Sequence, residues 1–376
     1  MIEISIYIHV PFCRRRCAYC SFISYAGREA DIPAYARALV QELRLRPVED
    51  AEIKTIYFGG GTPSLLPVDA LSQILETVKE RNKIADNAEI TLEANPGTVS
   101  REYLKAIRSL GVNRLSLGVQ SLEDVELGLL GRIHTSTQAC ESIHQAKETG
   151  FTNLSLDFIY GIPGRSLKTW RKMLNKIVSL GARHLSLYGL TLEEGTPLHE
   201  GIKNGKIQSP DPDAAASEYE MAEEMLQAAG YKQYEISNWS LPGFESRHNL
   251  VYWQRGPYLG LGVAAHSFLD NRRIANTSDL DVYLSALSEG ILPPQTAEVI
   301  DKAAALSEAV ILGLRLNEGI SANDIKAHFS IDLHRHFANE IAECSSFGLL
   351  EEQGRRLRLT PRGRLLGNEV FMRFVA

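Results

Sequence analysis

Apolar residues follow two alternating patterns along the first half of the chain. Short β-branched or alternating apolar runs predict strands, and they read ISIYIHV, TIYFGGG, ITLEANP, RLSLGVQS, NLSLDFIYG and HLSLYGL. Between these runs, apolar residues recur at the spacing of one helix face, which predicts helices over 34–45, 68–80, 100–110, 137–149 and 167–180. Gly111, Gly150 and Gly181 each follow such a stretch, where a helix commonly ends on a residue with positive φ. The pattern therefore describes six strand–helix units.

Repeated strand–helix units predict an α/β fold in which parallel strands form a sheet that is covered by helices. Such a sheet is either open and doubly wound or curved into a barrel. Eight units complete a TIM barrel, so six units predict a partial (β/α)6 TIM-like barrel that is open on one side.

Chemically unusual residues stand at the ends of the apolar runs. They are the cysteine loop after the first run, Gly59 to Thr62 after the second, and then Glu93, Asn95, Gln120, Asp157 and Thr191. Because the carboxyl ends of barrel strands meet at one rim, these residues predict a single site there. The alternative is that Glu93, Gln120 and Asp157 only end strands and cap helices. Their recurrence on successive strands favours the site.

The pattern changes near residue 290. Apolar spacing predicts helices over 301–316, 321–329 and 333–347, followed by two alternating strands around Gln353 and Gly354 and a closing helix. This order predicts a winged-helix-like α+β domain. We therefore expect a partial barrel over 1–235, a connecting segment with an HNxxYW motif over 236–295, and the C-terminal domain over 296–376.

Five arginines cluster at the predicted wing and raise nucleic-acid binding as one hypothesis. They are Arg355, Arg356, Arg358, Arg362 and Arg364. Acidic residues lie beside them, and the whole chain carries 40 Lys and Arg against 46 Asp and Glu, a net charge of −6. Because such a chain has no overall positive field, we expect no nucleic-acid partner.

The chain shows no apolar run of the length that crosses a bilayer, and no signal peptide fits before Cys13. Five cysteines are an odd number, and Cys140 and Cys344 stand alone, which is not how a secreted disulfide framework is built. We expect a cytoplasmic protein without an integral membrane segment, and leave a peripheral membrane partner open.

Three cysteines lie within eight residues, in the order C-x3-C-x2-C at Cys13, Cys17 and Cys20. A structural zinc site takes four protein ligands, and His9 is the nearest other candidate. A four-iron cube held by three thiolates instead leaves one iron without a protein ligand, and that position is open for chemistry.

The segment CRRRCAYC, with an aromatic residue directly before its last cysteine, resembles the signature of the radical S-adenosylmethionine (SAM) superfamily. The resemblance implies a [4Fe-4S] cluster on Cys13, Cys17 and Cys20, with SAM on the fourth iron. It further implies that an electron from the cluster cleaves the sulfonium to a 5′-deoxyadenosyl radical.

Further motifs narrow the resemblance to the oxygen-independent coproporphyrinogen III oxidase group and, within it, to the haem-chaperone (HemW) branch. They are YIHVPFC, GGGTPSLL, RLSLGVQS, LDFIYGIPG and YWQRGPYLGLGVAAHS. The oxidases continue the cluster motif with another cysteine at the position of Phe22, so this difference favours the chaperone branch. The resemblance implies SAM contacts at Tyr7, Tyr19, Gly60, Gly61, Thr62, Glu93, Gln120, Arg132 and Asp157.

The segment RHNLVYW resembles the H-N-x-x-Y-W motif of that branch, which implies haem binding through His248. Imidazole is a common axial ligand of haem, and Tyr252 and Trp253 offer an apolar wall. His266 is a second candidate ligand.

Three hypotheses of function follow. The favoured one is a haem chaperone on a radical SAM scaffold that delivers haem to an acceptor protein and draws on an electron donor. The first alternative is an enzyme that oxidatively decarboxylates coproporphyrinogen propionates, and the second is a nucleic-acid-modifying radical SAM protein.

Overall fold

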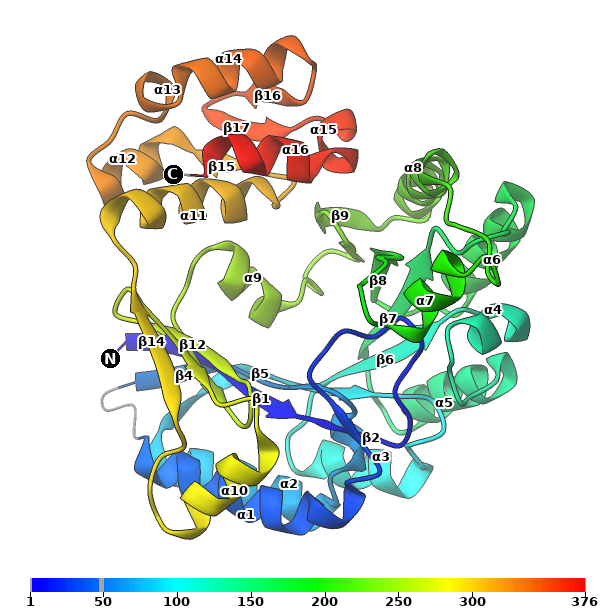
Figure 1. The fold of residues 1–376 in the computed structure, drawn as a ribbon, viewed down its shortest axis with the longest axis vertical. Coiled ribbons are helices and arrows are strands. Elements are labelled where there is room, and N and C mark those ends of the chain that lie inside the picture. The colour runs from blue at the N-terminus through cyan, green and yellow to red at the C-terminus, as the bar shows by residue number, and fades with distance from the viewer. Residues whose placement is uncertain (1, 47–50, 376) are drawn as a thin grey trace.

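A computed structural model describes residues 2–46 and 51–375, and its centre is a curved sheet of six parallel strands (Figure 1). These strands are β1 (Ile2–Val10), β4 (Ala51–Gly60), β5 (Lys83–Ala94), β6 (Arg114–Gln120), β7 (Asn153–Tyr160) and β8 (His184–Gly189). Each pairs in parallel with the next along the chain. The predicted α/β fold with a partial barrel is confirmed.

Helices cover the outer face of the sheet. They are α1 (Ile32–Leu45), α2 (Val68–Arg81), α3 (Arg101–Ser109), α4 (Asp124–Leu129), α5 (Ser136–Glu148), α6 (Leu167–Ser179) and α8 (Pro212–Ala228). The short helix α7 (Pro197–Lys203) lies at the rim, where the N–H of Leu198 donates to the carbonyl of Ala18. Ser100, Thr135 and Ser166 cap three of the covering helices by accepting a backbone N–H. The glycines predicted to end α3, α5 and α6 have positive φ, which confirms that prediction. Over the described ranges, no helix is long and apolar enough to cross a membrane.

The two faces of the barrel strands differ in polarity. Outward residues such as Ile6, Ile56 and Leu117 are fully buried against the helices and form one continuous apolar core. Inward residues are mostly polar, because side chains alternate between the faces of a strand. Parallel strands are usually apolar on both faces, so this barrel has an unusually polar interior.

The chain after α8, which begins within the predicted barrel range and includes the predicted connecting segment, extends the same sheet at both edges. On the β8 edge lie β10 (Asn238–Ser240) and β9 (Lys232–Glu235), and on the β1 edge lie β11 (Tyr258–Leu261), β12 (His266–Leu269), β13 (Arg272–Asn276) and β14 (Gln295–Val299). The helix α9 (Arg247–Trp253) lies in the space between the curved sheet and the C-terminal helices, and α10 (Leu280–Ser288) packs beside α1 (Figure 1).

The C-terminal residues form a second apolar core of their own. Their elements are α11 (Lys302–Leu314), β15 (Ile320–Ser321), α12 (Ala322–Phe329), α13 (Leu333–His336), α14 (Ala338–Ser346), β16 (Leu350–Gln353), β17 (Arg356–Leu359), α15 (Pro361–Leu365) and α16 (Gly367–Phe371). The predicted hairpin around Gln353 and Gly354 is confirmed. The third predicted helix is interrupted at Phe337, whose ring turns into the core against Phe374 at 5.2 Å between centroids.

Three of the five wing arginines are held in ion pairs. Arg356 pairs with Glu318 at 3.2 Å, Arg358 pairs with Glu351 at 2.7 Å, and Arg364 pairs with Glu223 on α8. These pairs neutralise much of the charge that suggested nucleic-acid binding, and the Arg364–Glu223 pair attaches the C-terminal domain to the barrel.

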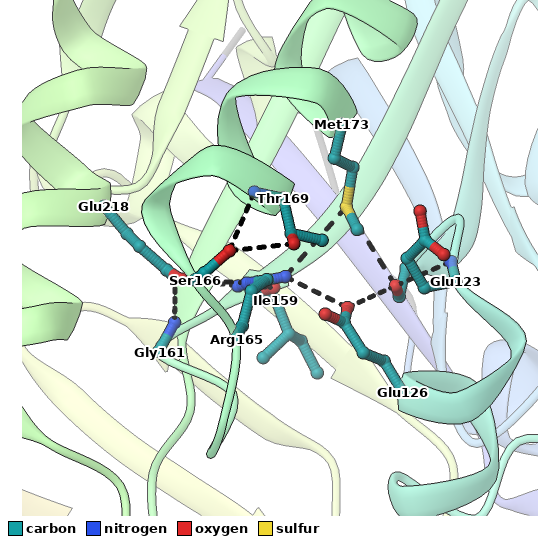
Figure 2. A network of polar contacts seen from close by, with 10 residues as sticks. Glu123, Glu126, Ile159, Gly161, Arg165, Ser166, Thr169, Met173 and Glu218 are labelled. Carbon is teal, nitrogen blue, oxygen red and sulfur yellow. Dashed lines mark hydrogen bonds and ion pairs between the residues drawn. The ribbon is translucent and has the colours of Figure 1, made fainter.

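A buried ion network fixes the loop that follows β7 (Figure 2). The side chain of Arg165 is 0% exposed and lies between Glu126 of α4 at 3.1 Å and Glu218 of α8 at 2.8 Å. Arg165 also donates to the carbonyl of Ile159, and Glu218 accepts from the backbone N–H of Gly161. The network therefore joins two helices to the end of a barrel strand.

We expect Arg165→Leu to lower the free energy of unfolding by about 3–5 kcal/mol, because two carboxylates would stay buried without their cation. Arg101→Leu is the matched control, since Arg101 pairs with Glu148 on the surface and exposed pairs contribute about 0–1 kcal/mol. Urea unfolding of both variants measures the difference. Equal losses would show that the buried network carries no special stability.

Candidate functional site

The polar residues of the barrel interior are neighbours in the sheet register. Ser5 lies beside Thr55, Tyr7 beside Tyr57, Glu93 beside Ser116, and Asp157 lies between Gly118 and Ser186. Tyr7, Tyr57, Glu93, Asp157 and Gln120 all keep partial solvent exposure, although they lie on strands in the middle of the sheet. The interior is therefore accessible from the rim.

The three clustered cysteines lie in a loop that is closed at its base by β2 (Phe12–Cys13) and β3 (Tyr25–Ala26). The N–H of Ala18 donates to the carbonyl of Leu130, and the carbonyl of Ala18 accepts from the N–H of Leu198. These contacts hold the loop between the segment after β6 and α7, as the dark-blue trace in Figure 1 shows. Cys13, Cys17 and Cys20 are each partly exposed.

No group of three or more His, Cys, Asp or Glu within residues 2–46 and 51–375 converges on one point as ligands of a single metal ion would. A structural zinc site needs four such ligands around one ion. The ligands of a cubic cluster do not converge on one point, because each thiolate binds a different iron at a different corner.

A chain of polar contacts joins two of the cysteines through the rim. Thr62 Oγ1 donates to Cys13 Sγ at 3.5 Å, and Asn95 Nδ2 donates to Thr62 Oγ1 at 2.9 Å. Arg132 donates to Asn95 Oδ1 and, through Nη1 at 3.3 Å, to Cys17 Sγ. Arg132 Nε is buried and has no hydrogen-bond partner among the described residues. The rim thus brings the thiol groups of Cys13 and Cys17 near the guanidinium group of Arg132, whose Nε has no partner among the described residues.

The glycine turn after β4 makes the close approach that this contact chain needs. Gly60 has φ +112°, and a Cβ there would lie 2.7 Å from the ring of His9. A Cβ on Gly61 would lie 2.7 Å from the carbonyl oxygen of Phe12 and 2.9 Å from Cys13 Sγ. Only glycine lets the turn pack directly against the cysteine loop.

Two carboxylates lie on the inner wall of the barrel. Glu93 accepts from Tyr57 Oη at 2.7 Å and from the N–H of Gly60 at 3.2 Å, and burial raises its pKa from the ordinary value near 4.5 to about 7. Asp157 accepts from Ser116 Oγ at 3.0 Å, and burial raises its pKa as well, against the hydrogen bonds of its serine neighbours. A cationic ligand would stabilise the ionised form of both groups.

Aromatic residues connect the interior to the cysteine loop. Tyr7 Oη lies 2.9 Å from His9 Nδ1, and His9 Nε2 lies 3.1 Å from the carbonyl oxygen of Ile23. Since a carbonyl only accepts, Nε2 carries the proton and Nδ1 accepts from Tyr7. Burial lowers the pKa of His9, so the ring holds the loop as a neutral group.

The remaining predicted SAM contacts lie on the β6 side of the rim. Gln120 ends β6 with φ +68°, an uncommon left-handed conformation for a residue with a side chain, and it follows a register shift in the pairing with β7. A Cβ on Gly118 would lie 3.0 Å from Gln120 Nε2 and 3.4 Å from Arg132 Nη2, so both side chains lie close to this glycine. Tyr19 packs against Leu130 and its neighbours beneath the loop. The structure therefore brings the predicted SAM residues together from five strands and the cysteine loop.

His248 lies inside the barrel, on α9, and is 1% exposed. Its ring stacks on Tyr57 at 4.8 Å between centroids, and Thr55 Oγ1 lies 2.6 Å from Nδ1. Because the Thr55 hydroxyl donates to Ser5, it accepts from Nδ1–H, which leaves Nε2 to accept from Tyr252 Oη at 2.9 Å. Burial and the charge of Arg114 lower the pKa of His248 to about 3, so the ring is neutral.

Sequence reasoning did not select Tyr57 and Ser116, which complete the site. Tyr57 bridges Glu93 and His248, and Ser116 supports Asp157. Asn95, which the sequence placed on the rim, bridges Thr62 and Arg132. The available signal was the alternation within each strand, in which every second residue is polar over the whole strand and not only at its end.

Comparisons with known proteins agree with this geometry. A model of the radical SAM superfamily matches residues 7–177, and a model of the HemN C-terminal domain matches residues 300–366. Heme chaperone HemW of Bacillus subtilis is 35% identical over 99% of this chain and 99% of its own length. Heme chaperone HemW of Mycobacterium tuberculosis is 36% identical over 97% of this chain and 93% of its own length.

The same architecture occurs in a solved structure, coproporphyrinogen III oxidase (HemN) from Escherichia coli, which is described as a radical SAM enzyme. It matches with a TM-score of 0.86 and 23% identity, over 99% of this chain and 90% of that chain. At this identity the likeness shows the fold.

Proposed function

The chain belongs to the HemW family of the radical SAM superfamily, and we propose that it binds a [4Fe-4S] cluster, SAM and haem and delivers haem to an acceptor protein. The family itself implies the cluster and SAM. The names of the two bacterial relatives, heme chaperones, support the haem part of the proposal. The acceptor protein and an electron donor are the partners that this function requires.

The contact chain from Cys13 through Thr62, Asn95 and Arg132 to Cys17 is the observation that carries the proposal. It places thiols, a glycine turn and a spare arginine donor at one rim, which fits a cluster on Cys13, Cys17 and Cys20. When bound, the cluster supplies one electron to the sulfonium of SAM.

We propose that the remaining rim residues hold SAM. Gly60, Gly61 and Thr62 offer backbone close to the methionine part, and Arg132 offers a donor to its carboxylate. Glu93 and Asp157 suit the ammonium group and the ribose hydroxyls, while Gln120, Tyr7 and Tyr19 line the remainder. Apart from Thr62, which is buried, these side chains are partly exposed and so open to a ligand.

We propose that haem is held through His248 Nε2. The neutral ring is the form that binds iron, and its depressed pKa keeps it neutral at physiological pH. In the structure, the Nε2 lone pair is occupied by the hydroxyl of Tyr252. Haem binding therefore requires Tyr252 to release Nε2, and the affinity for haem depends on that hydrogen bond.

Each of Cys13→Ala, Cys17→Ala and Cys20→Ala is expected to abolish the broad visible absorbance of the anaerobically reconstituted cluster, because two thiolates do not retain the cube. Cys140→Ala on α5 and Cys344→Ala in the C-terminal core are the controls and should keep it. Iron analysis accompanies the spectra. A full four-iron spectrum in Cys17→Ala would remove that residue from the ligand set.

Glu93→Gln should weaken SAM binding about tenfold or more, because a charge-assisted hydrogen bond contributes about 1.5–3 kcal/mol. Asp157→Asn should act in the same direction. Calorimetric titration measures both, with Glu141→Gln on the exposed face of α5 as the control. Wild-type affinity should also fall as the pH drops below about 7, where Glu93 takes up a proton, and Glu93→Gln should lose that dependence.

Glu93→Gln should also change the stability of the ligand-free protein. Because the folded-state pKa of Glu93 is raised, the native protein holds the extra proton, and its stability falls as the pH rises between about 4.5 and about 7. Above that window the loss is roughly 3 kcal/mol, which Glu93→Gln should restore. Thermal unfolding at pH 5 and pH 8 measures this, and a variant that is less stable at pH 8 would contradict the burial of a charged Glu93.

Tyr252→Phe should strengthen haem binding, because it frees Nε2 and keeps the aromatic wall. His248→Ala should remove the axial-ligand absorbance bands. His266→Ala tests the second candidate ligand, and His144→Ala on α5, whose side chain is 72% exposed, serves as the control. An anaerobic haem titration followed by absorbance compares the variants. The haem assignment would be wrong if His248→Ala bound haem like the wild type while remaining folded by circular dichroism.

A further inference from the structure

One arginine of the C-terminal domain lies against α9 without a partner of opposite charge. Arg315 directly follows α11, and its guanidinium group lies 4.4 Å from the ring centroid of Trp253. Among the described residues, Arg315 forms no ion pair, and its Nε is buried without a hydrogen-bond partner. By contrast, Arg255 lies over the ring of Phe268 and also pairs with Glu308 at 3.0 Å.

Glu235 is the acidic residue whose charge acts on Arg315, but the two side chains do not form an ion pair. Glu235 is fully buried on β9, and its Oε1 accepts from the N–H of Ser237 at 3.1 Å and from the side chain of Asn238. Burial raises the pKa of Glu235 and lowers the pKa of Arg315, against the attraction between the two charges. The guanidinium group of Arg315 is therefore left to be satisfied by water or by an anionic ligand.

The aromatic ring under Arg315 carries a second unused donor. The indole N–H of Trp253 is buried, and it too has no hydrogen-bond partner in the part of the chain that the structure describes. Trp253 is the last residue of α9 and directly follows Tyr252, whose hydroxyl donates to Nε2 of His248. Both unused donors therefore lie next to the residues that form the proposed haem site.

The barrel interior near these donors is open. Tyr188 lies on β8, which has a neighbouring strand on each side, and alternation places its side chain on the same inward face as Ser186, the register neighbour of Asp157. Tyr188 is nevertheless 43% exposed, so it faces open space in the interior. After burial and Glu235, Tyr188 is the next influence on the pKa of Arg315, which places these two side chains near each other.

We propose that Arg315 and Trp253 bind a propionate carboxylate of the haem whose iron is held by His248. This proposal rests on the haem site proposed above. Haem combines an apolar ring with two carboxylates, so a site for it needs an aromatic wall, an axial ligand and cationic donors. The two oxygens of a carboxylate accept from an arginine and an indole N–H together, and the charge makes the bond to arginine strong. Bound haem then contacts both the barrel and the C-terminal domain.

The test compares haem with its dimethyl ester, in which both propionates are uncharged. Anaerobic titrations followed by absorbance use the full-length wild type, Arg315→Gln, Arg315→Lys and His248→Ala. Arg183→Gln is the matched control, because exposed Arg183 also lies 4.4 Å from an aromatic centroid, that of Phe244, but directly precedes β8 at the end opposite Tyr188. Affinities are compared across variants within each ligand, and thermal unfolding without haem records any effect on folding.

We expect Arg315→Gln to weaken haem binding about tenfold and to leave the affinity for the ester within about twofold of the wild type, because only haem carries the charge that Arg315 binds. Arg315→Lys, which keeps the cation, should lose less, and Arg183→Gln should bind both ligands like the wild type. Equal losses for haem and ester in Arg315→Gln, or no loss for either, would overturn the proposal.

His248→Ala separates this proposal from the haem site on which it rests. Its substitution removes the axial ligand and should weaken haem and ester alike. If His248→Ala weakened neither ligand, the axial assignment would be wrong, whatever the result at Arg315.

Discussion

The alternation of side chains along the barrel strands is the constraint on which the rest of the structure depends. One face of each strand must be apolar, because it packs against the covering helices and forms the main core. The other face carries serines, tyrosines and carboxylates, and α9 contacts it through His248. A polar interior of this kind is stable only when its groups form hydrogen bonds with one another or with a ligand. Here the hydrogen bonds within the protein do not satisfy every group, since Arg132 Nε has no partner among the described residues.

The interior also brings two sites into one space. Glu93 accepts a hydrogen bond from Tyr57, and Tyr57 stacks on His248. Tyr57 therefore contacts both Glu93, a proposed SAM-binding residue, and His248, the proposed haem ligand. A change in the charge of Glu93 therefore alters the hydrogen bond of Tyr57, whose ring packs against His248. This contact offers a physical route by which the occupancy of one site could influence the other, and it involves only packed side chains.

The C-terminal domain takes part in holding His248 inside the barrel. The first turn of α9 is attached to the barrel, because Glu89 accepts the backbone N–H groups of Arg247 and His248. The other end meets the C-terminal domain, where Arg255 pairs with Glu308 at 3.0 Å and Arg315 lies over the ring of Trp253 at 4.4 Å. The helix that carries the proposed haem ligand therefore contacts the barrel at one end and the C-terminal domain at the other, and its position depends on both.

The sequence by itself determined the strand–helix order, the helix ends at Gly111, Gly150 and Gly181, the wing hairpin and the cysteine loop, because these follow from local spacing and turn chemistry. It also indicated the rim, since polar residues ended successive strands. Only the tertiary structure decided that Tyr57 belongs to the site and that Asn95 contacts Arg132. The partners of these two residues, Glu93 and Arg132, lie 36 and 37 residues away and meet them only through strand register and loop packing. The tertiary structure likewise decided that His248 faces inward with its Nε2 lone pair on Tyr252, since burial and a hydrogen-bond partner are properties of packing and leave no mark on the spacing of a motif.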